Sequence, residues 1–227
     1  MTATRNDPDH IFRTLKKYFL QREVVNFYEY LAGLEEGLGI RRQALLTNID
    51  LAQKSLSELG QNDERRSELL DLKIETEQLT AFTNILRQSF LTSLYSFMEL
   101  WLVRECFLDS KRRDGGKTYR ALVKLKPLQK VKQYFSHVTK SAYPFSTSED
   151  WVWVTNFQLL RNCIVHRQGS LSGFSDFKVD STLAKFRERE DGLDLFGVNN
   201  DQILVQPEFC IKALQTAHRF MVELLSL

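Results

Sequence analysis

Apolar residues recur at helical spacing along most of this 227-residue chain, and the longest such run covers residues 81–108. One face of this predicted helix carries large apolar side chains: Phe82, Leu86, Phe90, Leu94, Phe97 and Trp101. The same face is widened by Leu91, Met98 and Leu102. A helix with so broad an apolar surface has to be covered by other elements. We therefore predict that residues 81–108 form the central helix of a bundle.

Three further helices are predicted before the central one, over residues 10–31, 41–59 and 64–79. Glycines in the stretch AGLEEGLGI are expected to end the first of them. Gly60 separates the second and third, which are strongly charged and are predicted to form a helical hairpin.

Two helices are predicted after the central one, which is expected to end at the double glycine of positions 115–116. A short helix covers residues 128–138, and a longer one covers residues 148–167. A capping box predicts the start of the longer helix, because Ser146 precedes Glu149 by three residues.

After the predicted helix 148–167, the spacing of the apolar residues changes from that of a helix to that of strands. Residues 183–190, 193–196 and 201–206 alternate between apolar and polar side chains, as short strands do, around a turn at Asp191-Gly192. A closing amphipathic helix is predicted from Glu208 to Leu225, with a proline at its first turn.

These elements predict a mainly α fold, a helical bundle with a small β-hairpin before the C-terminal helix. Residues 1–80 are expected to be an N-terminal helical extension of the bundle, and residues 81–227 are expected to be its main domain. We expect the two parts to form one compact unit.

Composition excludes several classes of protein. The formal net charge of +2 is nearly neutral, so any attraction for nucleic acid has to come from local clusters of basic residues. The three cysteines, Cys106, Cys163 and Cys210, are odd in number and far apart, which argues against a disulfide framework or a zinc site. The first ten residues lack the apolar segment of a secretory signal, and the most apolar stretch is interrupted by Glu99 and Arg104. We expect a soluble, cytoplasmic protein without membrane contact.

The predicted helix 148–167 has two distinct stripes. Its buried stripe is formed by Trp153, Phe157, Leu160 and Ile164, and its polar stripe by Thr155, Gln158, Asn162 and His166. Arg161 lies at the edge of the apolar stripe, about 140° around the helix from His166. Cys163 lies off the polar stripe, which argues against its being a nucleophile.

The polar stripe has two possible meanings. Arginine carries a fixed charge suited to phosphate, and histidine can transfer a proton near neutral pH. Arg161 and His166 could therefore hold a scissile phosphate and move the proton of a 2'-hydroxyl, a group that distinguishes RNA from DNA. The alternative is an ordinary solvated helix face, in which His166 and Arg167 interact favourably with the C-terminal end of the helix dipole.

The stretch RNCIVH, residues 161–166, resembles the R-x-x-x-x-H signature of the HEPN (higher eukaryotes and prokaryotes nucleotide-binding) superfamily. The resemblance extends over about residues 81–227. It implies an all-α bundle with the motif near the end of a helix. It also implies a homodimer in which two facing motifs form one composite site, and metal-independent endoribonuclease activity of the kind found in toxin–antitoxin, phage-defence and RNA-processing systems.

By this resemblance, Arg161 would bind and stabilise the phosphate and His166 would be the acid and base. Asn162 would orient or polarise the reacting groups. The implied products carry 2',3'-cyclic phosphate and 5'-hydroxyl ends.

Two other features are compatible with an RNA site. Ten basic residues lie between positions 104 and 132, and the candidate RNA-binding residues among them are Lys111, Arg112, Arg113, Lys117 and Arg120. The alternative is a solvated loop and helix face. Glu99 belongs to a thin polar stripe of the central helix and is a candidate to support the site, the alternative being a buried or interfacial structural role.

Other motifs are incomplete. The stretch GGKT suggests a phosphate-binding loop, but that motif needs a glycine at the position occupied by Lys111. No acidic pair or histidine group has metal-ligand spacing, so we expect neither a metal nor a cofactor.

The resemblance thus implies a HEPN-type endoribonuclease that acts as a toxin or phage-defence effector. The partners that it implies are RNA, a second copy of the chain, and an antitoxin or defence-system protein. Two alternatives remain open. One is a catalytically inactive helical dimer that binds nucleotide or RNA or scaffolds a partner protein. The other is a toxin-neutralising or adaptor protein that uses its charged N-terminal helices as the interaction surface.

Overall fold

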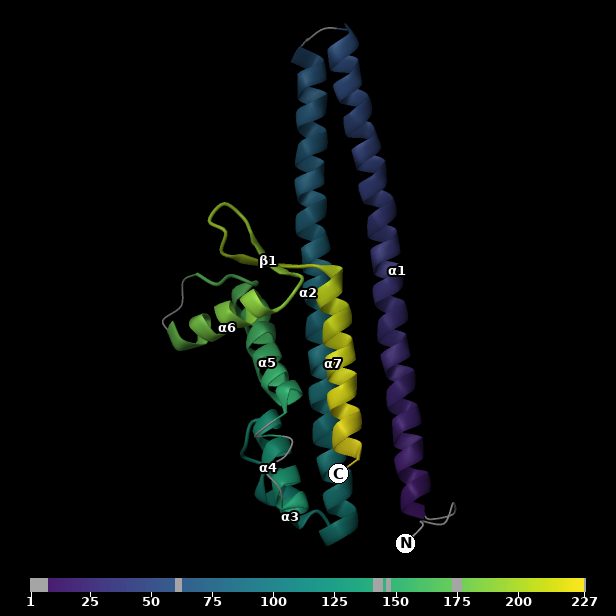
Figure 1. Cartoon of the computed structure of the whole chain (residues 1–227), viewed down its shortest axis with the longest axis vertical. Helices are drawn as coiled ribbons and strands as arrows, with labels where there is room; N and C mark the ends of the chain where they lie inside the picture. Colours follow the sequence, from purple (N-terminus) through teal and green to yellow (C-terminus); the bar gives the residue numbers. More distant parts are fainter. Residues whose placement is uncertain (1–7, 60–62, 141–144, 146–147, 173–176, 227) are drawn as a thin grey trace.

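The computed structural model describes residues 8–59, 63–140, 145, 148–172 and 177–226. Within these residues it contains seven α-helices and one antiparallel sheet of two strands. The sheet directly precedes the C-terminal helix (Figure 1). The predicted fold class, mainly α with a small β-hairpin before the last helix, is confirmed.

Two very long helices dominate the molecule. α1 (Pro8–Leu59) and α2 (Asp63–Asp114) each contain 52 residues. At about 1.5 Å per residue, each is about 78 Å long. They run antiparallel, side by side, and reach well beyond the rest of the chain (Figure 1). The predicted break between the helices 10–31 and 41–59 is therefore wrong, and the domain boundary expected between residues 80 and 81 falls inside the continuous helix α2.

The continuity of α1 has a clear packing cause. Buried or half-buried side chains recur at alternating spacings of three and four residues, with one position skipped: Leu20, Val24, Phe27, Leu31, Leu34, Leu38, Leu45, Ile49, Ala52 and Leu56. This is the heptad pattern of a coiled-coil seam. The seam continues through the glycines at positions 33, 37 and 39. Each of them weakens a helix by about 1 kcal/mol relative to alanine, so packing against α2 overrides the local preference.

Five further helices and the hairpin form the body around the second half of α2. Their bounds are α3 (Lys117–Ala121), α4 (Pro127–Thr139), α5 (Glu149–Arg167), α6 (Phe177–Arg189), β1 (Leu193–Phe196), β2 (Gln202–Val205) and α7 (Pro207–Leu225). α7 packs against α1 and α2, whereas α4 and α5 cover another side of α2 (Figure 1). The predicted short helix, motif helix and closing helix are confirmed with small changes at their ends.

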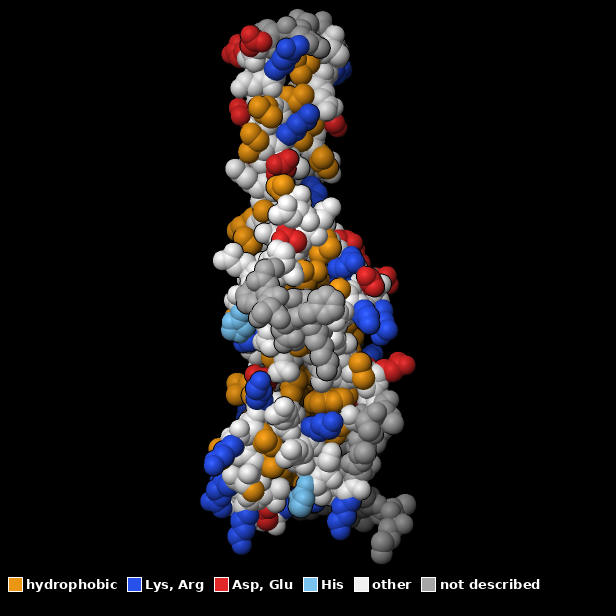
Figure 2. Space-filling view, turned by 90° about the vertical axis from the view of Figure 1, so that its left-hand side faces the viewer, with side chains coloured by type: hydrophobic (Ala, Val, Ile, Leu, Met, Phe, Trp, Pro, Cys, Tyr) orange, Lys and Arg blue, Asp and Glu red, His pale blue; other side chains and the backbone are white. Residues whose placement is uncertain are grey.

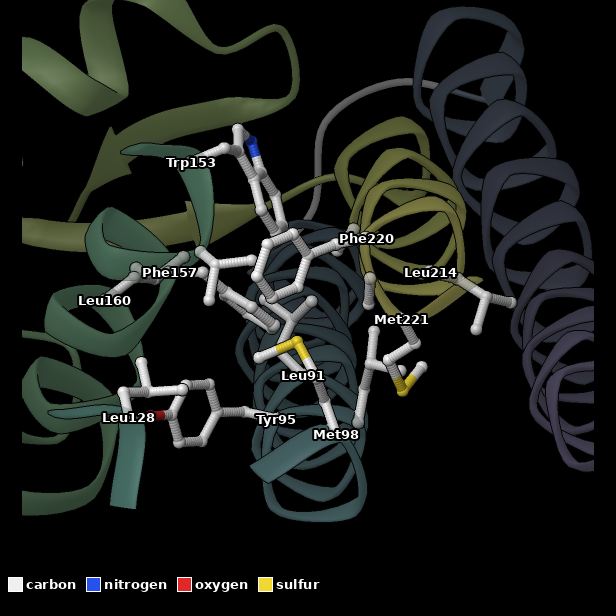
Figure 3. Packing of buried hydrophobic residues seen from close by; sticks show 14 of the residues in the cluster. Leu91, Tyr95, Met98, Leu128, Trp153, Phe157, Leu160, Leu214, Phe220 and Met221 are labelled. Carbon is white, nitrogen blue, oxygen red and sulfur yellow. The ribbon is translucent and has the colours of Figure 1, made fainter. Parts of the chain in front are cut away.

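The core confirms the central place of α2. Leu91, Tyr95 and Met98 lie on α2 between side chains of α5 and α7 (Figure 3). The α5 side is formed by Trp153, Phe157 and Leu160, and the α7 side by Leu214, Phe220 and Met221. All of these side chains are buried.

One predicted strand is a helix. Residues 183–190 alternate in sequence, but most of them belong to α6. Leu183 and Phe186, three residues apart, face the core, and the Phe186 ring packs against Trp153 of α5 at 6.0 Å between centroids. The two remaining strands pair as predicted, with Leu193 opposite Val205.

Candidate functional site

Helix α5 carries the RNCIVH motif in its last two turns. The helix begins at Glu149, with Ser148 as the N-cap, close to the predicted start. Ser146, the other half of the predicted capping box, lies outside the described residues. α5 ends at Arg167 because Gln168 and Gly169 both adopt positive φ angles, 53° and 79°.

The two predicted stripes of α5 are present. The buried stripe consists of Trp153, Phe157, Leu160 and Ile164, and the polar stripe of Thr155, Gln158, Asn162 and His166 is half-buried or exposed. Cys163 is buried, and its thiol donates to the Ser170 carbonyl oxygen at 3.2 Å. This placement keeps Cys163 away from the solvent-facing side of the helix, in agreement with the sequence.

Arg161 is held in place at the edge of the two stripes. Its guanidinium carbon lies 5.8 Å from the centroid of the Tyr95 ring, and its Nη1 donates to Oδ1 of Asn162 at 3.1 Å. Its Nε is buried without an acceptor. In the part of the chain that the structure describes, Arg161 has no carboxylate partner and its Nη2 has no hydrogen-bond partner. The positive charge is therefore fixed in position but not neutralised.

Asn162 and His166 differ in environment. Asn162 is half-buried, and its side-chain oxygen is occupied by Arg161, so its visible role is to hold that side chain. His166 lies one turn further along α5 and is exposed. It has no hydrogen-bond partner among the described residues. The structure thus brings Arg161 and Asn162 together and leaves the imidazole free.

Tyr95 of α2 is a site residue that the sequence did not indicate. Its hydroxyl donates to Oε1 of Glu99 at 3.0 Å. The pKa of Tyr95 is raised far above its usual range, mainly because the hydroxyl is buried and to a lesser extent because the negatively charged Glu99 carboxylate is close by. Glu99 was predicted as a supporting residue, and it is connected to Arg161 through Tyr95 and not by direct contact. Only the four-residue spacing of the two α2 residues could have indicated the pair.

The predicted RNA-binding residues lie at the other end of the body. Arg112 and Arg113 both donate to the carboxylate of Asp109, and Arg120 donates to the Gly115 carbonyl oxygen. The remaining two, Lys111 and Lys117, are exposed. Figure 2 shows Lys and Arg side chains gathered at the lower end of the molecule, where Figure 1 places α3 and α4.

This basic end is separate from the motif. Glu99 and Lys111 are twelve residues apart on α2, which corresponds to about 18 Å along the helix axis. An RNA strand would have to span this distance to contact both regions.

The GGKT stretch does not form an open phosphate-binding loop. The backbone amides of Gly116, Lys117 and Thr118 all donate to the carboxylate of Asp114, each at 2.9 Å. The hydrogen bonds from Thr118 lower the pKa of Asp114, which favours its charged form. The amides that would bind a phosphate are thus already occupied.

Comparison with known proteins gives no relative, since no family model, curated protein or solved structure matches this chain. Among the described residues, no group of three or more His, Cys, Asp and Glu side chains could hold a metal ion. None of the helices in the described segments is both long enough and apolar enough to cross a membrane.

Proposed function

We propose that this protein is a metal-independent endoribonuclease of the HEPN type. The observation that carries the proposal is the arrangement on α5, where a fixed, unneutralised guanidinium precedes an exposed imidazole in the last two turns of one helix. The guanidinium of Arg161 can bind a phosphate, and the imidazole of His166 can transfer a proton near neutral pH.

The proposed reaction is an internal transesterification of RNA. The 2'-oxygen attacks the adjacent phosphorus while His166 accepts its proton, and the bond to the 5'-oxygen breaks as that oxygen takes up a proton. Arg161 stabilises the charge that develops on the non-bridging oxygens. The products are a 2',3'-cyclic phosphate and a 5'-hydroxyl, and the reaction needs no oxidant or metal.

We also propose that the active form is a homodimer. Arg161 and His166 project about 140° apart around α5, so two copies related by a two-fold axis could complete each other's site. We propose that the second copy covers exposed apolar side chains of α2, where Phe82, Ile85 and Leu100 are 53%, 58% and 71% exposed.

The proposal is tested by RNA cleavage in the presence of EDTA. We expect the protein to cleave single-stranded RNA with cyclic-phosphate ends, and we expect His166→Ala and Arg161→Ala each to reduce the rate by at least about 100-fold. The melting temperature should stay nearly unchanged for His166→Ala, because it is an exposed substitution.

Two matched variants serve as controls. His137→Ala and Arg189→Ala remove exposed side chains of the same types from α4 and α6, and both should retain full activity. Cleavage that requires added magnesium, or full activity in His166→Ala, would contradict the proposed chemistry.

The biological setting that fits this reaction is a cytoplasmic toxin or phage-defence effector, which an antitoxin or another defence-system protein would hold inactive. A second candidate function, a scaffold for a partner protein, is favoured by the long α1–α2 hairpin. Its outer surface exposes Ile40, Leu51, Leu70 and Ile74 among charged residues. Figure 2 shows hydrophobic side chains interspersed with charged ones along the upper part of the molecule, where Figure 1 places the α1–α2 hairpin. A protein that binds such a partner but cleaves no RNA would favour the scaffold.

A further inference from the structure

Arg161 has a long side chain that loses conformational freedom when it binds a phosphate. Immobilising such a side chain opposes binding by about 0.5 to 1.5 kcal/mol, or roughly 2- to 13-fold in affinity. A protein avoids this loss when the side chain is already held in its binding conformation. The question is what holds Arg161.

The usual solution, a carboxylate partner, is not used here. The Glu99 carboxylate accepts a hydrogen bond from Tyr95, and no described carboxylate lies within ion-pair distance of Arg161. A carboxylate would fix the guanidinium and also neutralise it. An aromatic ring attracts the cation without removing its charge.

Tyr95 is itself rigidly held. It is only 2% exposed, and its ring meets the ring of Phe157 edge-on, with centroids 5.6 Å apart and planes at 80°. Its hydroxyl is fixed by a hydrogen bond to Glu99. Figure 3 shows the ring leaving α2 toward the side of the core occupied by α5. Because burial keeps this hydroxyl protonated, the ring stays neutral.

We propose that Tyr95 is the positioning residue for Arg161, its ring forming the platform on which the guanidinium lies and its hydrogen bond to Glu99 fixing that platform. The contribution of Tyr95 to RNA binding rests on the proposed function. The positioning itself does not, and it can be measured without RNA.

The first experiment observes Arg161 directly. In nitrogen-15-labelled protein, the Nε–Hε resonance of Arg161 is identified by its loss in Arg161→Lys. We expect this resonance to be resolved and slow to exchange with water in the wild type and in Tyr95→Phe, which keeps the ring. In Tyr95→Leu it should join the fast-exchanging resonances of exposed arginines.

The second experiment measures the affinity for a short 2'-O-methyl RNA, which cannot be cleaved by attack of the 2'-oxygen. Tyr95→Leu should weaken binding about tenfold, and Tyr95→Phe less than about threefold. In the double variant with Arg161→Ala, Tyr95→Leu should add no further loss, because its effect acts through the missing guanidinium.

Phe90→Leu is the matched control. Phe90 is a fully buried aromatic residue of the same helix, but its ring packs against Phe27 of α1. This variant should lose stability yet retain both the Arg161 resonance and the affinity. If Tyr95→Leu does not fold, Tyr95→Met removes the ring but keeps a longer and more flexible apolar side chain that can adapt to the space, and it should give the same two results.

The outcomes separate the two proposals. If the wild type neither binds nor cleaves RNA but the resonance pattern holds, the proposed function fails and the positioning role stands. If the wild type cleaves RNA while Tyr95→Leu and Tyr95→Met keep the protected resonance and full affinity, the positioning role is overturned and the function stands.

Discussion

Individual glycines show how far local preference and packing can diverge in this chain. Gly169 follows α5 with φ +79°, and a Cβ atom there would lie 2.8 Å from Nε2 of Gln88. Gly37 lies inside α1, with nothing within 4 Å of its would-be Cβ. The first glycine is required by its conformation, and the second is only tolerated.

Alanine at these two positions should therefore act in opposite directions. Gly169→Ala forces a left-handed conformation on alanine, which should lower the free energy of unfolding by about 1 to 2 kcal/mol. Gly37→Ala should raise it by about 0.5 to 1 kcal/mol, because a helical glycine gives up more backbone entropy. Urea unfolding of both variants measures the difference, and stabilisation by Gly169→Ala would show that the turn after α5 is not constrained.

At the scale of elements, a set of buried polar side chains on α2 attaches the β-hairpin. Asn84 donates to the Ile203 carbonyl oxygen at 2.9 Å and accepts from the Val205 amide at 2.8 Å. Gln88 donates to the same Ile203 oxygen at 3.1 Å. On its other side the Ile203 amide donates to the Gly169 carbonyl oxygen at 2.9 Å. The end of the motif helix is thus connected to α2 through β2.

Asn84→Ala tests this attachment. It leaves the buried Val205 amide without its acceptor, so we expect the free energy of unfolding to fall by about 1 to 3 kcal/mol. Hydrogen exchange at Val205 should accelerate at the same time. Ser89→Ala, an exposed change one turn away on the same helix, should alter neither quantity, and an equal effect of the two changes would contradict the attachment.

The elements also show which features a sequence can predict. The end of α5 and the start of α7 were predictable because a glycine and a proline act locally on the backbone. The continuity of α1 was not, since its glycines are overridden by the seam with α2. Tyr95 and Arg161, which are in contact, are 66 positions apart in the sequence (161 − 95). Such a contact depends on how α2 and α5 pack, which no local pattern contains.

At the scale of the whole molecule, the single chain exposes several large apolar side chains. The apolar residues Phe82, Ile85 and Leu100 are exposed on α2, the helix that also carries Tyr95. In the proposed dimer these side chains meet the second copy, so replacing Ile85 and Leu100 by glutamate should place charges in the contact and keep the chain monomeric. Light scattering should show a dimer for the wild type and a monomer for the double variant, with cleavage lost in parallel. A monomeric wild type that cleaves RNA would rule out the composite site.

A mixing experiment decides whether Arg161 and His166 act across the dimer. Arg161→Ala and His166→Ala should each be inactive alone. When they are co-refolded, about half of the dimers are mixed, and a mixed dimer contains one intact set if the arginine of one copy works with the histidine of the other. Since a wild-type dimer has two sets, about a quarter of the wild-type activity should return. If both groups act within one copy, every dimer lacks a complete set and the mixture stays inactive. Recovery of activity would thus assign the two halves of the motif to different copies of the chain.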